Sequence, residues 1–397
     1  MNSVLSCTLA HWLVNYNAHA AEYVAEFLGH RPSCIKTYKS ITLLTPTGAF
    51  IRCVQVWLQS RVVDIAATDE LVYLQNQLKC SLGSTCSLWS LVEDGDSLIV
   101  LKQLFQWSPT QVLHCGYVVN SVCWHPSKNQ LVSASNDTVQ LWDLDVVPTA
   151  PAVIDDCGTT VAYCVSFNPS GQYLACCDGT GAIRIWTISN PLHVHVLAGH
   201  STSVNSISWH PSRNWLLSGS NDQTIRIWDI DLLQCIHIGT GHTGSIMSVH
   251  WHPNGTRFVS GSDDGTIRIW NTTGTCLAML IISGDIISSV RWHPSGKWIA
   301  SAQFNGIIEI WDTASSKRIH VKHDPTERVQ CVRWHPSGKY LAGGSANGTI
   351  RIWCATKWVL RASFQSESTS LLFAIEWHPS GNRIASASRN KTVCIWN

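Results

Sequence analysis

Short runs of alternating apolar and polar residues, separated by turn-forming residues, follow one another along most of the chain. One segment shows the pattern clearly, with runs at 204–209, 215–220, 224–228 and 233–238. His210-Pro211-Ser212 separates the first two runs, and its proline fixes φ and keeps the preceding residue extended. Asn221-Asp222-Gln223 provides a tight turn before the third run. Bounded runs of this length predict antiparallel strands, so the segment predicts four of them.

The same segment recurs along the chain. Its first run ends on an aromatic residue that returns every 41 to 43 residues, at Trp124, Phe167, Trp209, Trp251, Trp292, Trp334 and Trp377. A second tryptophan follows 18 or 19 residues later, at Trp142, Trp186, Trp228, Trp270, Trp311, Trp353 and Trp396. Four short strands per repeat match the blade of a propeller. Because one blade cannot cover both of its faces, the repeats are expected to stack radially into a closed ring.

The repeats carry residues that identify a family. Gly199-His200, Gly241-His242 and the pairs Trp142-Asp143, Trp228-Asp229 and Trp311-Asp312 resemble WD40 repeats. The resemblance covers about residues 97–397 and implies an all-β, seven-bladed WD40 β-propeller. Residues 1–96 do not show the repeat pattern clearly. They form either an N-terminal extension of undefined fold or a degenerate blade, which would make eight blades.

The resemblance also implies a hydrogen-bonded chain of His, Ser or Thr, Asp and Trp inside each blade. Two repeats contain the complete set of residues, namely His200, Ser218, Asp222 and Trp228, and His242, Ser260, Asp264 and Trp270. The other repeats depart from it. A blade with an incomplete set is expected to be softer, because a partly satisfied polar network loses much of its stabilising effect.

The last repeat stops directly after its third strand, at Trp396-Asn397. Its outer strand must therefore come from another part of the chain. The apolar segment 97–105 stands just before the first repeat, and we expect it to pair with residues 392–396 and close the ring. Such a strand would cover an edge that is otherwise exposed.

Composition and charge limit the remaining possibilities. The net charge of +1 gives no overall field that attracts nucleic acid or an anionic membrane. No run reaches the ~18 apolar residues of a membrane helix, so we expect no membrane insertion. Sixteen cysteines are present without a Cys-x-x-Cys pair, and no basic signal segment begins the chain. The cysteine spacing and the lack of a signal segment predict reduced thiols in an intracellular protein, cytoplasmic or nuclear.

Catalytic and metal-binding motifs are not recognisable in the repeats. The recurring histidines lie at the same turn of different blades, at His125, His210, His252, His293, His335 and His378. They would form a wide ring, whereas a zinc ion needs ligands ~2 Å from one point. We therefore expect no metal, no cofactor and no enzymatic activity.

Partner binding is the positive prediction. In WD40 relatives the narrow face binds peptides through the start of each first strand and the turn between the second and third strands. Mapped onto these repeats, the predicted partner-binding residues are Asn120, Tyr163, Asn205, Met247, Phe304, Arg328, Gln330, Leu371, Phe373 and Arg389. Arginines beside aromatic residues suit an acidic or phosphorylated peptide. The sequence thus predicts a non-catalytic scaffold within a multiprotein complex, with an RNA-binding subunit of a ribonucleoprotein complex as the alternative.

Overall fold

A computed structural model describes the backbone of four strands within residues 38–104. It also describes residues 109–397 apart from 147–150, 157–159, 283–284, 324–327 and 367–369. The chain divides into two compact units, Met1–Phe105 and Gln106–Asn397. In the first unit β1 (Tyr38–Leu44) pairs with β2 (Phe50–Val56), and β3 (Leu88–Asp94) pairs with β4 (Leu98–Leu104), both antiparallel. None of the described residues belongs to a helix long and apolar enough to cross a membrane.

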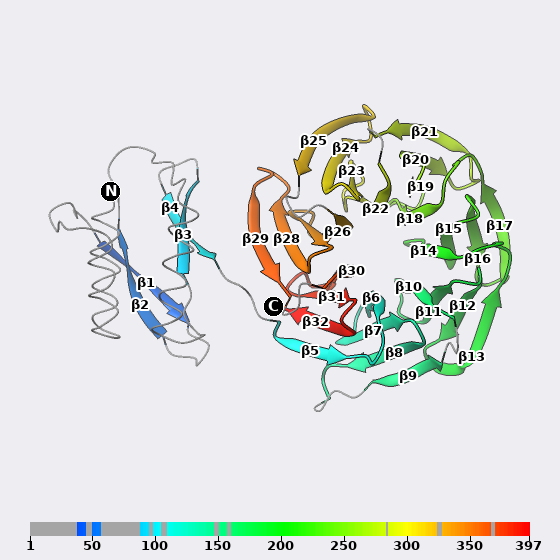
Figure 1. The fold of residues 1–397 in the computed structure, drawn as a ribbon, viewed down its shortest axis with the longest axis horizontal. Coiled ribbons are helices and arrows are strands. Elements are labelled where there is room, and N and C mark those ends of the chain that lie inside the picture. The colour runs from blue at the N-terminus through cyan, green and yellow to red at the C-terminus, as the bar shows by residue number, and fades with distance from the viewer. Residues whose placement is uncertain are drawn as a thin grey trace. The chain divides into compact units, whose positions relative to one another are not determined.

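The second unit consists of seven four-stranded antiparallel sheets arranged radially around one axis (Figure 1). Blade 1 consists of β6 (Val119–Trp124), β7 (Gln130–Ser135), β8 (Thr138–Asp143) and β9 (Ala152–Asp156). Blade 2 consists of β10 (Ala162–Phe167), β11 (Tyr173–Asp178), β12 (Ile183–Thr187) and β13 (Asn190–Leu197). Blade 3 consists of β14 (Val204–Trp209), β15 (Trp215–Ser220), β16 (Ile225–Asp229) and β17 (Gln234–Gly239). Blades 4 and 5 are β18 Ile246–Trp251, β19 Arg257–Ser262, β20 Thr266–Asn271 and β21 Cys276–Ile281; β22 Ile287–Trp292, β23 Trp298–Gln303, β24 Ile307–Asp312 and β25 Lys317–His323. Blades 6 and 7 are β26 Val329–Trp334, β27 Tyr340–Ser345, β28 Thr349–Cys354 and β29 Leu360–Gln365; β30 Leu372–Trp377, β31 Ile384–Ser388, β32 Thr392–Trp396 and β5 Gln111–His114. The prediction of a seven-bladed propeller is confirmed, and the eight-bladed alternative is wrong for the ring that the structure describes.

The strand that completes blade 7 is β5, which pairs with β32 through Val112 and Leu113. The prediction that residues 97–105 form this strand is wrong, because Leu98–Leu104 is β4 and pairs with β3. The longer apolar segment was the more conspicuous candidate. An outermost strand needs few apolar residues, however, since one of its edges faces solvent. Leu113, only 4 % exposed, supplies the buried contact.

The hydrophobic core lies between neighbouring blades. One cluster joins Leu217, Ile225 and Ile227 of blade 3 to Ile246 and Trp251 of blade 4. The described part of every other blade shares clusters of this kind with a neighbour. Burial of apolar side chains between sheets stabilises by about 25 cal/mol per Å², so the sheets are stable only as stacked neighbours.

Each first strand is an inner sheet edge, and in several blades side chains of the preceding blade cap its unpaired N–H groups. Ser206 Oγ accepts from the N–H of Val249 at 3.1 Å, and Ser248 Oγ accepts from the N–H of Val290 at 3.1 Å. Buried backbone donors without partners would be costly. Polar residues in the first strands therefore have a structural reason to be there.

The repeat histidines connect blades on the opposite side of the ring from the narrow face. His210 Nδ1 accepts backbone N–H groups of its own turn, so Nε2 carries the proton and donates to Gly255 O of the next blade at 3.0 Å. His293 makes the same bond to Gly338 O at 3.0 Å. Burial lowers the pKa of both imidazoles. Among the described residues no group of three or more His, Cys, Asp or Glu side chains could hold a metal ion.

Candidate functional site

The narrow face is built by one backbone contact that all seven blades share. The N–H of a residue in the turn between the second and third strands donates to the carbonyl of the residue just before the first strand. The contacts measure between 2.9 and 3.2 Å, and their donors are Asn136, Gly179, Asn221, Asp263, Phe304, Ala346 and Arg389. The turns between second and third strands and the starts of the first strands therefore lie side by side on the same face.

The ten predicted partner-binding residues all lie on this face and keep some exposure. Tyr163 and Arg389 are exposed, and the other eight are half-buried. Two of them also hold the ring together, because Asn120 Nδ2 donates to Ala162 O at 2.9 Å and Asn205 Nδ2 donates to Ile246 O at 3.0 Å. These two side chains thus bridge to the first strand of the next blade. Their partner-binding role stays a prediction.

Three of the predicted residues form one cluster across blades 5 and 6. The guanidinium of Arg328 lies over the ring of Phe304, 3.7 Å from its centroid, and Arg328 Nε donates to Gln330 Oε1 at 3.1 Å. A cation over an aromatic face is worth about 0.5–1 kcal/mol at an exposed site. The contact holds a positive charge in a fixed position on the narrow face.

Both complete sets of His, Ser, Asp and Trp form the hydrogen-bonded chain that the resemblance implies. In blade 3, His200 Nδ1 lies 2.7 Å from Asp222 Oδ2 and its Nε2 lies 2.7 Å from Ser218 Oγ. Trp228 Nε1 donates to the same Ser218 hydroxyl at 2.8 Å. The chain of His242, Ser260, Asp264 and Trp270 has the same geometry in blade 4. Burial lowers the pKa of His200 and His242, which the facing aspartates partly offset.

The incomplete blades keep only part of this chain. Trp311 Nε1 donates to Ser301 Oγ at 3.2 Å and Trp396 Nε1 donates to Ser386 Oγ at 2.9 Å. In blade 2 an ion pair between Arg184 and Asp178, 2.7 Å long, stands on the same strands. In blades 5 and 7 the serine thus holds the tryptophan without the histidine and aspartate that extend the chain in blades 3 and 4.

Two layers of side chains line the axis of the ring. We call the layer at the start of the first strands the upper ring; it consists of Asn120, Tyr163, Asn205, Met247, Ser288, Gln330 and Phe373. The lower ring lies three residues further along each strand, or about 10 Å deeper at ~3.3 Å per residue, and consists of Cys123, Ser166, Ser208, His250, Arg291, Arg333 and Glu376. A register shift after the first residue of every first strand leaves one residue unpaired, as in a β-bulge. The bulge changes the alternation, which is why the side chain three positions later, and not two, faces the axis again.

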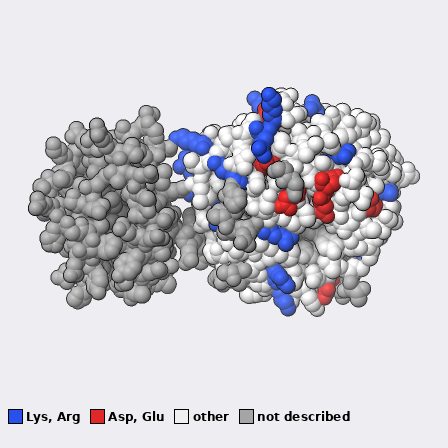
Figure 2. Space-filling view, turned by 45° about the horizontal axis from the view of Figure 1, so that its top comes forward, with Lys and Arg blue, Asp and Glu red and all other residues white. Residues whose placement is uncertain are grey.

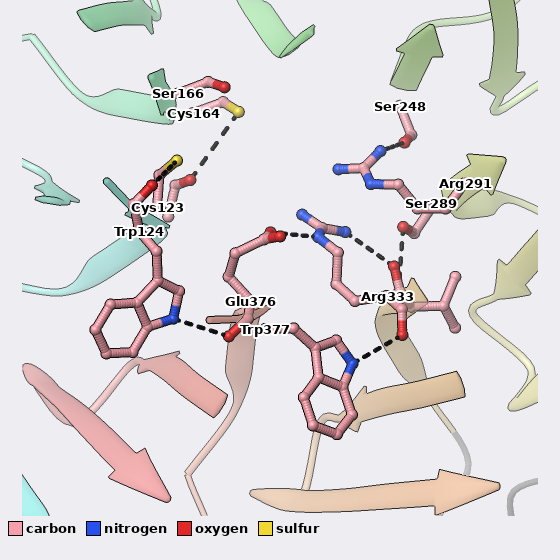
Figure 3. Close-up of polar contacts among 12 residues, drawn as sticks. Cys123, Trp124, Cys164, Ser166, Ser248, Ser289, Arg291, Arg333, Glu376 and Trp377 are labelled. Atoms are coloured by element: carbon pink, nitrogen blue, oxygen red, sulfur yellow. Dashed lines mark hydrogen bonds and ion pairs between the residues drawn. The ribbon is translucent and has the colours of Figure 1, made fainter. Parts of the chain in front are cut away.

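The lower ring carries charges that sequence reasoning missed. Arg333 Nε donates to Glu376 Oε2 at 2.7 Å, with the two side chains 15 % and 32 % exposed (Figure 3). Arg291 lies on the neighbouring strand and directs its guanidinium toward the same space in the close-up. Burial lowers the pKa of Arg291 to about 9, and the positive charge of Arg333 adds to this effect. The signal that could have found these residues is the seven-fold repeat itself, read three positions after the upper ring.

The charges on the face that Figure 2 draws are dispersed. Figure 2 shows basic and acidic side chains singly and in small groups on a face that is mostly uncharged. A nucleic-acid footprint would be a continuous basic patch or stripe, and the described residues of this face form none.

The ring of seven four-stranded sheets defines the class of the protein, a seven-bladed β-propeller. Seven consecutive segments match the family model "WD domain, G-beta repeat", at residues 107–143, 155–187, 191–229, 233–271, 274–312, 316–354 and 358–397. The chain belongs to the WD-repeat family.

Individual relatives are similar over parts of their length. The chain is 26% identical over 166 residues to the small ribosomal subunit protein RACK1y of Oryza sativa subsp. japonica, which covers 40% of this chain and 48% of that protein. It is 30% identical over 88 residues to the protein LST8 homolog of Drosophila melanogaster, and this match covers 20% of this chain and 26% of that protein. The matched segments thus span about half and about a quarter of these relatives.

One solved structure extends the comparison to most of the chain. A chain in the "Crystal Structure of Mitotic Checkpoint Complex" matches 86% of this chain and 99% of its own length, with a TM-score of 0.69 and 18% identity. At that identity the likeness shows the fold alone.

Proposed function

We propose that this protein is a non-catalytic scaffold that binds a partner protein on the narrow face of its propeller. The observation that carries the proposal is the contrast between the repeated strands of the blades and the variable side chains of the narrow face. Seven blades repeat the same strands and the same turn contact, while the side chains that this contact presents differ from blade to blade. A rigid framework with variable loop residues is typical of a binding surface.

The face offers residues of the kind that dominate protein interfaces. Tyr163 is 38 % exposed; Phe373 of the upper ring and Leu371, two residues before it, are half-buried. Arg328, held over Phe304, adds a positioned cation. Aromatic residues and arginine are enriched among the residues that contribute most to binding. A peptide with aromatic or aliphatic anchors and an acidic or phosphorylated group would complement them.

The relatives support a place in a multiprotein assembly. One is named as a protein of the small ribosomal subunit, and the similar solved fold belongs to a mitotic checkpoint complex. We infer a comparable role for this chain, in a complex of its own. RNA binding is not favoured, because the charges on the face in Figure 2 are dispersed and the net charge is only +1.

Affinity capture tests the proposal. The full chain and the variant Tyr163→Ala/Arg328→Ala/Phe373→Ala are used as baits in cells, and the captured proteins are identified by mass spectrometry. A matched control carries Val196→Ala/Ile238→Ala/Met279→Ala, three exposed residues of the outer strands β13, β17 and β21. All three proteins must first show the same thermal stability.

The proposal predicts partners that the wild type and the outer-strand control both capture and the narrow-face variant loses. Capture of the same partners by all three baits would contradict it. Loss from the outer-strand control alone would place binding on the rim of the propeller instead.

A further inference from the structure

The lower ring holds more positive than negative charge. Arg291 and Arg333 contribute two positive charges and Glu376 one negative charge, while the remaining four positions are Cys123, Ser166, Ser208 and His250. These seven side chains sum to one positive charge when His250 is neutral. The neighbouring Cys164 thiol stands outside this sum; its hydrogen bond with Cys177 and, less strongly, the charges of Arg291 and Arg333 lower its pKa to about 6, so it adds some negative charge at neutral pH. Burial lowers the pKa of His250 well below its usual value, and the two arginines lower it further, so His250 adds no charge near neutral pH.

Arg333 forms an ion pair with Glu376. Arg291 forms no ion pair among the described residues, although the charge of Glu376 reaches it and partly offsets the lowering of its pKa. Arg333 is paired with Glu376 through Nε and donates through Nη1 to Val332 O at 3.0 Å. Arg291 donates only through Nη1, to Val290 O at 2.9 Å, to Ser248 Oγ at 3.1 Å and to Val249 O at 3.4 Å. These partners are neutral. The described ion pairs of the chain do not include Arg291.

A half-buried guanidinium that forms no ion pair is an unusual arrangement. Desolvation of a charge is expensive unless the charge is paired. Arg291 is half-buried, and the same desolvation together with Arg333 lowers its pKa. Its backbone contacts fix the side chain in place, so the guanidinium is preorganised, and an anion that enters the ring would bind without the cost of ordering it.

Apart from the two arginines and Glu376, the side chains of the lower ring can donate hydrogen bonds or carry no charge. His250 Nδ1 accepts the N–H of Trp292 at 3.3 Å, which leaves the proton on Nε2. Ser166 and Ser208 are hydroxyls. Glu376 is the one carboxylate of the ring, and Arg333 already binds it. The ring therefore suits one further acceptor that carries a negative charge.

The charge balance distinguishes between anions. A carboxylate carries one negative charge, which matches the sum over the seven side chains of the lower ring. A phosphomonoester carries about −1.5 to −2 at neutral pH, which exceeds the available positive charge and would increase repulsion with Glu376. The arrangement favours the carboxylate.

We propose that Arg291 and Arg333 bind the carboxylate of an acidic side chain that a partner peptide inserts along the propeller axis, past the upper ring. Figure 3 shows the two arginines reaching from β22 and β26 toward the same space, with Glu376 of β30 beside them. This proposal rests on the proposed function, in which a partner protein binds to the narrow face. The upper ring and Arg328 would then hold the peptide backbone and its anchors, and the lower ring would select for an Asp or Glu residue.

The test uses the full chain with ¹⁵N-labelled arginine. The probe is glutamate with capped backbone termini, titrated while the side-chain Nε–H signals of Arg291 and Arg333 are followed by NMR. Capped glutamine, which has the same shape without the charge, and inorganic phosphate are the comparison probes. Arg291→Met removes the charge, and Arg291→Lys keeps it.

We expect saturable shifts of both arginine signals with capped glutamate and none with capped glutamine. Hydrogen bonds to charged groups are the strong ones, so Arg291→Met should weaken binding by about tenfold or more, while Arg291→Lys keeps most of it. Glu376→Gln raises the charge of the ring and should strengthen binding several-fold, which tests the inference even if Arg291→Met does not fold. Equal response to capped glutamine, unchanged affinity of Arg291→Met or Glu376→Gln, or tighter binding of phosphate would overturn it.

Capture with the Arg291→Met bait connects the ring to the partner. Loss of a partner that the wild type captures supports the inserted acidic side chain, and unchanged capture contradicts it. The proposed function fails separately, when the Tyr163/Arg328/Phe373 variant keeps every partner. Capped glutamate contacts only the axis, so the titration does not depend on that result.

Discussion

At the scale of single residues, the two recurring series of aromatic residues have different tasks. Four first-series tryptophans, Trp124, Trp209, Trp334 and Trp377, donate to a carbonyl of the preceding blade, as when Trp209 Nε1 donates to Ser166 O at 2.9 Å. Five second-series tryptophans, Trp142, Trp228, Trp270, Trp311 and Trp396, donate to a serine of their own blade, as Trp270 does to Ser260 Oγ at 2.8 Å. The same residue type therefore stabilises the contact between sheets at one position and the polar chain inside a sheet at the other.

The complete polar chain predicts a difference between equivalent serines. Ser260→Ala leaves both the Trp270 N–H and His242 Nε2 without their buried partner, and it should lower the free energy of unfolding by about 1–3 kcal/mol. Ser301→Ala removes the corresponding hydroxyl in a blade that has no such histidine, and should lower it less. Urea unfolding of both variants checks the order. Equal losses would show that the histidine adds nothing to the chain.

The buried histidines predict a pH dependence. The folded-state pKa values of His200, His210, His242, His252 and His293 lie below the usual 6.5, and burial is the largest cause in each. Below pH 6.5 the unfolded chain binds more protons than the folded chain, so stability falls as pH decreases, until the folded-state pKa values are reached.

Thermal unfolding between about pH 8 and pH 5 at constant ionic strength measures this effect, with the decline expected below about pH 6.5. His293→Gln removes one of the titrating groups and should make the decline shallower. A stability that stays flat across this range would contradict the assigned protonation states.

At the scale of strands and blades, the sequence predicted the repeated elements well. The alternating run, the His-Pro turn and the second tryptophan correctly placed the first three strands of each blade. The bulge in each first strand could not be predicted from alternation, because it depends on the pairing with the second strand. Arg291, Arg333 and Glu376 were missed for that reason.

The closing strand was missed for a different reason. Propensity favoured the long apolar run of 97–105, but that run pairs within the first compact unit as β4. Four residues suffice at the outer edge of blade 7, where only Leu113 of β5 is deeply buried. Tertiary pairing, and not local hydrophobicity, decided which segment closes the ring.

Two matched substitutions test this closure. Leu113→Asp places a charge in the core beside blade 7 and should destabilise the propeller strongly, because an unpaired buried charge is costly. Leu101→Asp makes the same change in β4 and should leave the unfolding transition of the propeller unchanged. Differential scanning calorimetry compares the two variants with the wild type. The reverse order would return the closing strand to residues 97–105.

At the scale of the whole molecule, a repeated framework stabilises the propeller, and the narrow face, for which we propose recognition, varies from blade to blade. Burial between blades, the first-strand caps and the histidine contacts repeat around the ring, whereas the residues of the narrow face vary. The sequence predicted which residues would lie on this face, because the family resemblance places them at fixed positions in each repeat. It could not predict that Asn120 and Asn205 would be tied to the next blade, since those partners are backbone carbonyls of another repeat.

The most direct test of the account is a photocrosslink from a single position on the narrow face. A photoreactive phenylalanine analogue replaces Tyr163, and in a second protein it replaces Val196 on the outer strand of the same blade, where the side chain is 56 % exposed. The account predicts that irradiation in cells links a partner protein to position 163 and not to position 196. A partner linked only from position 196 would contradict it and place recognition on the rim of the propeller.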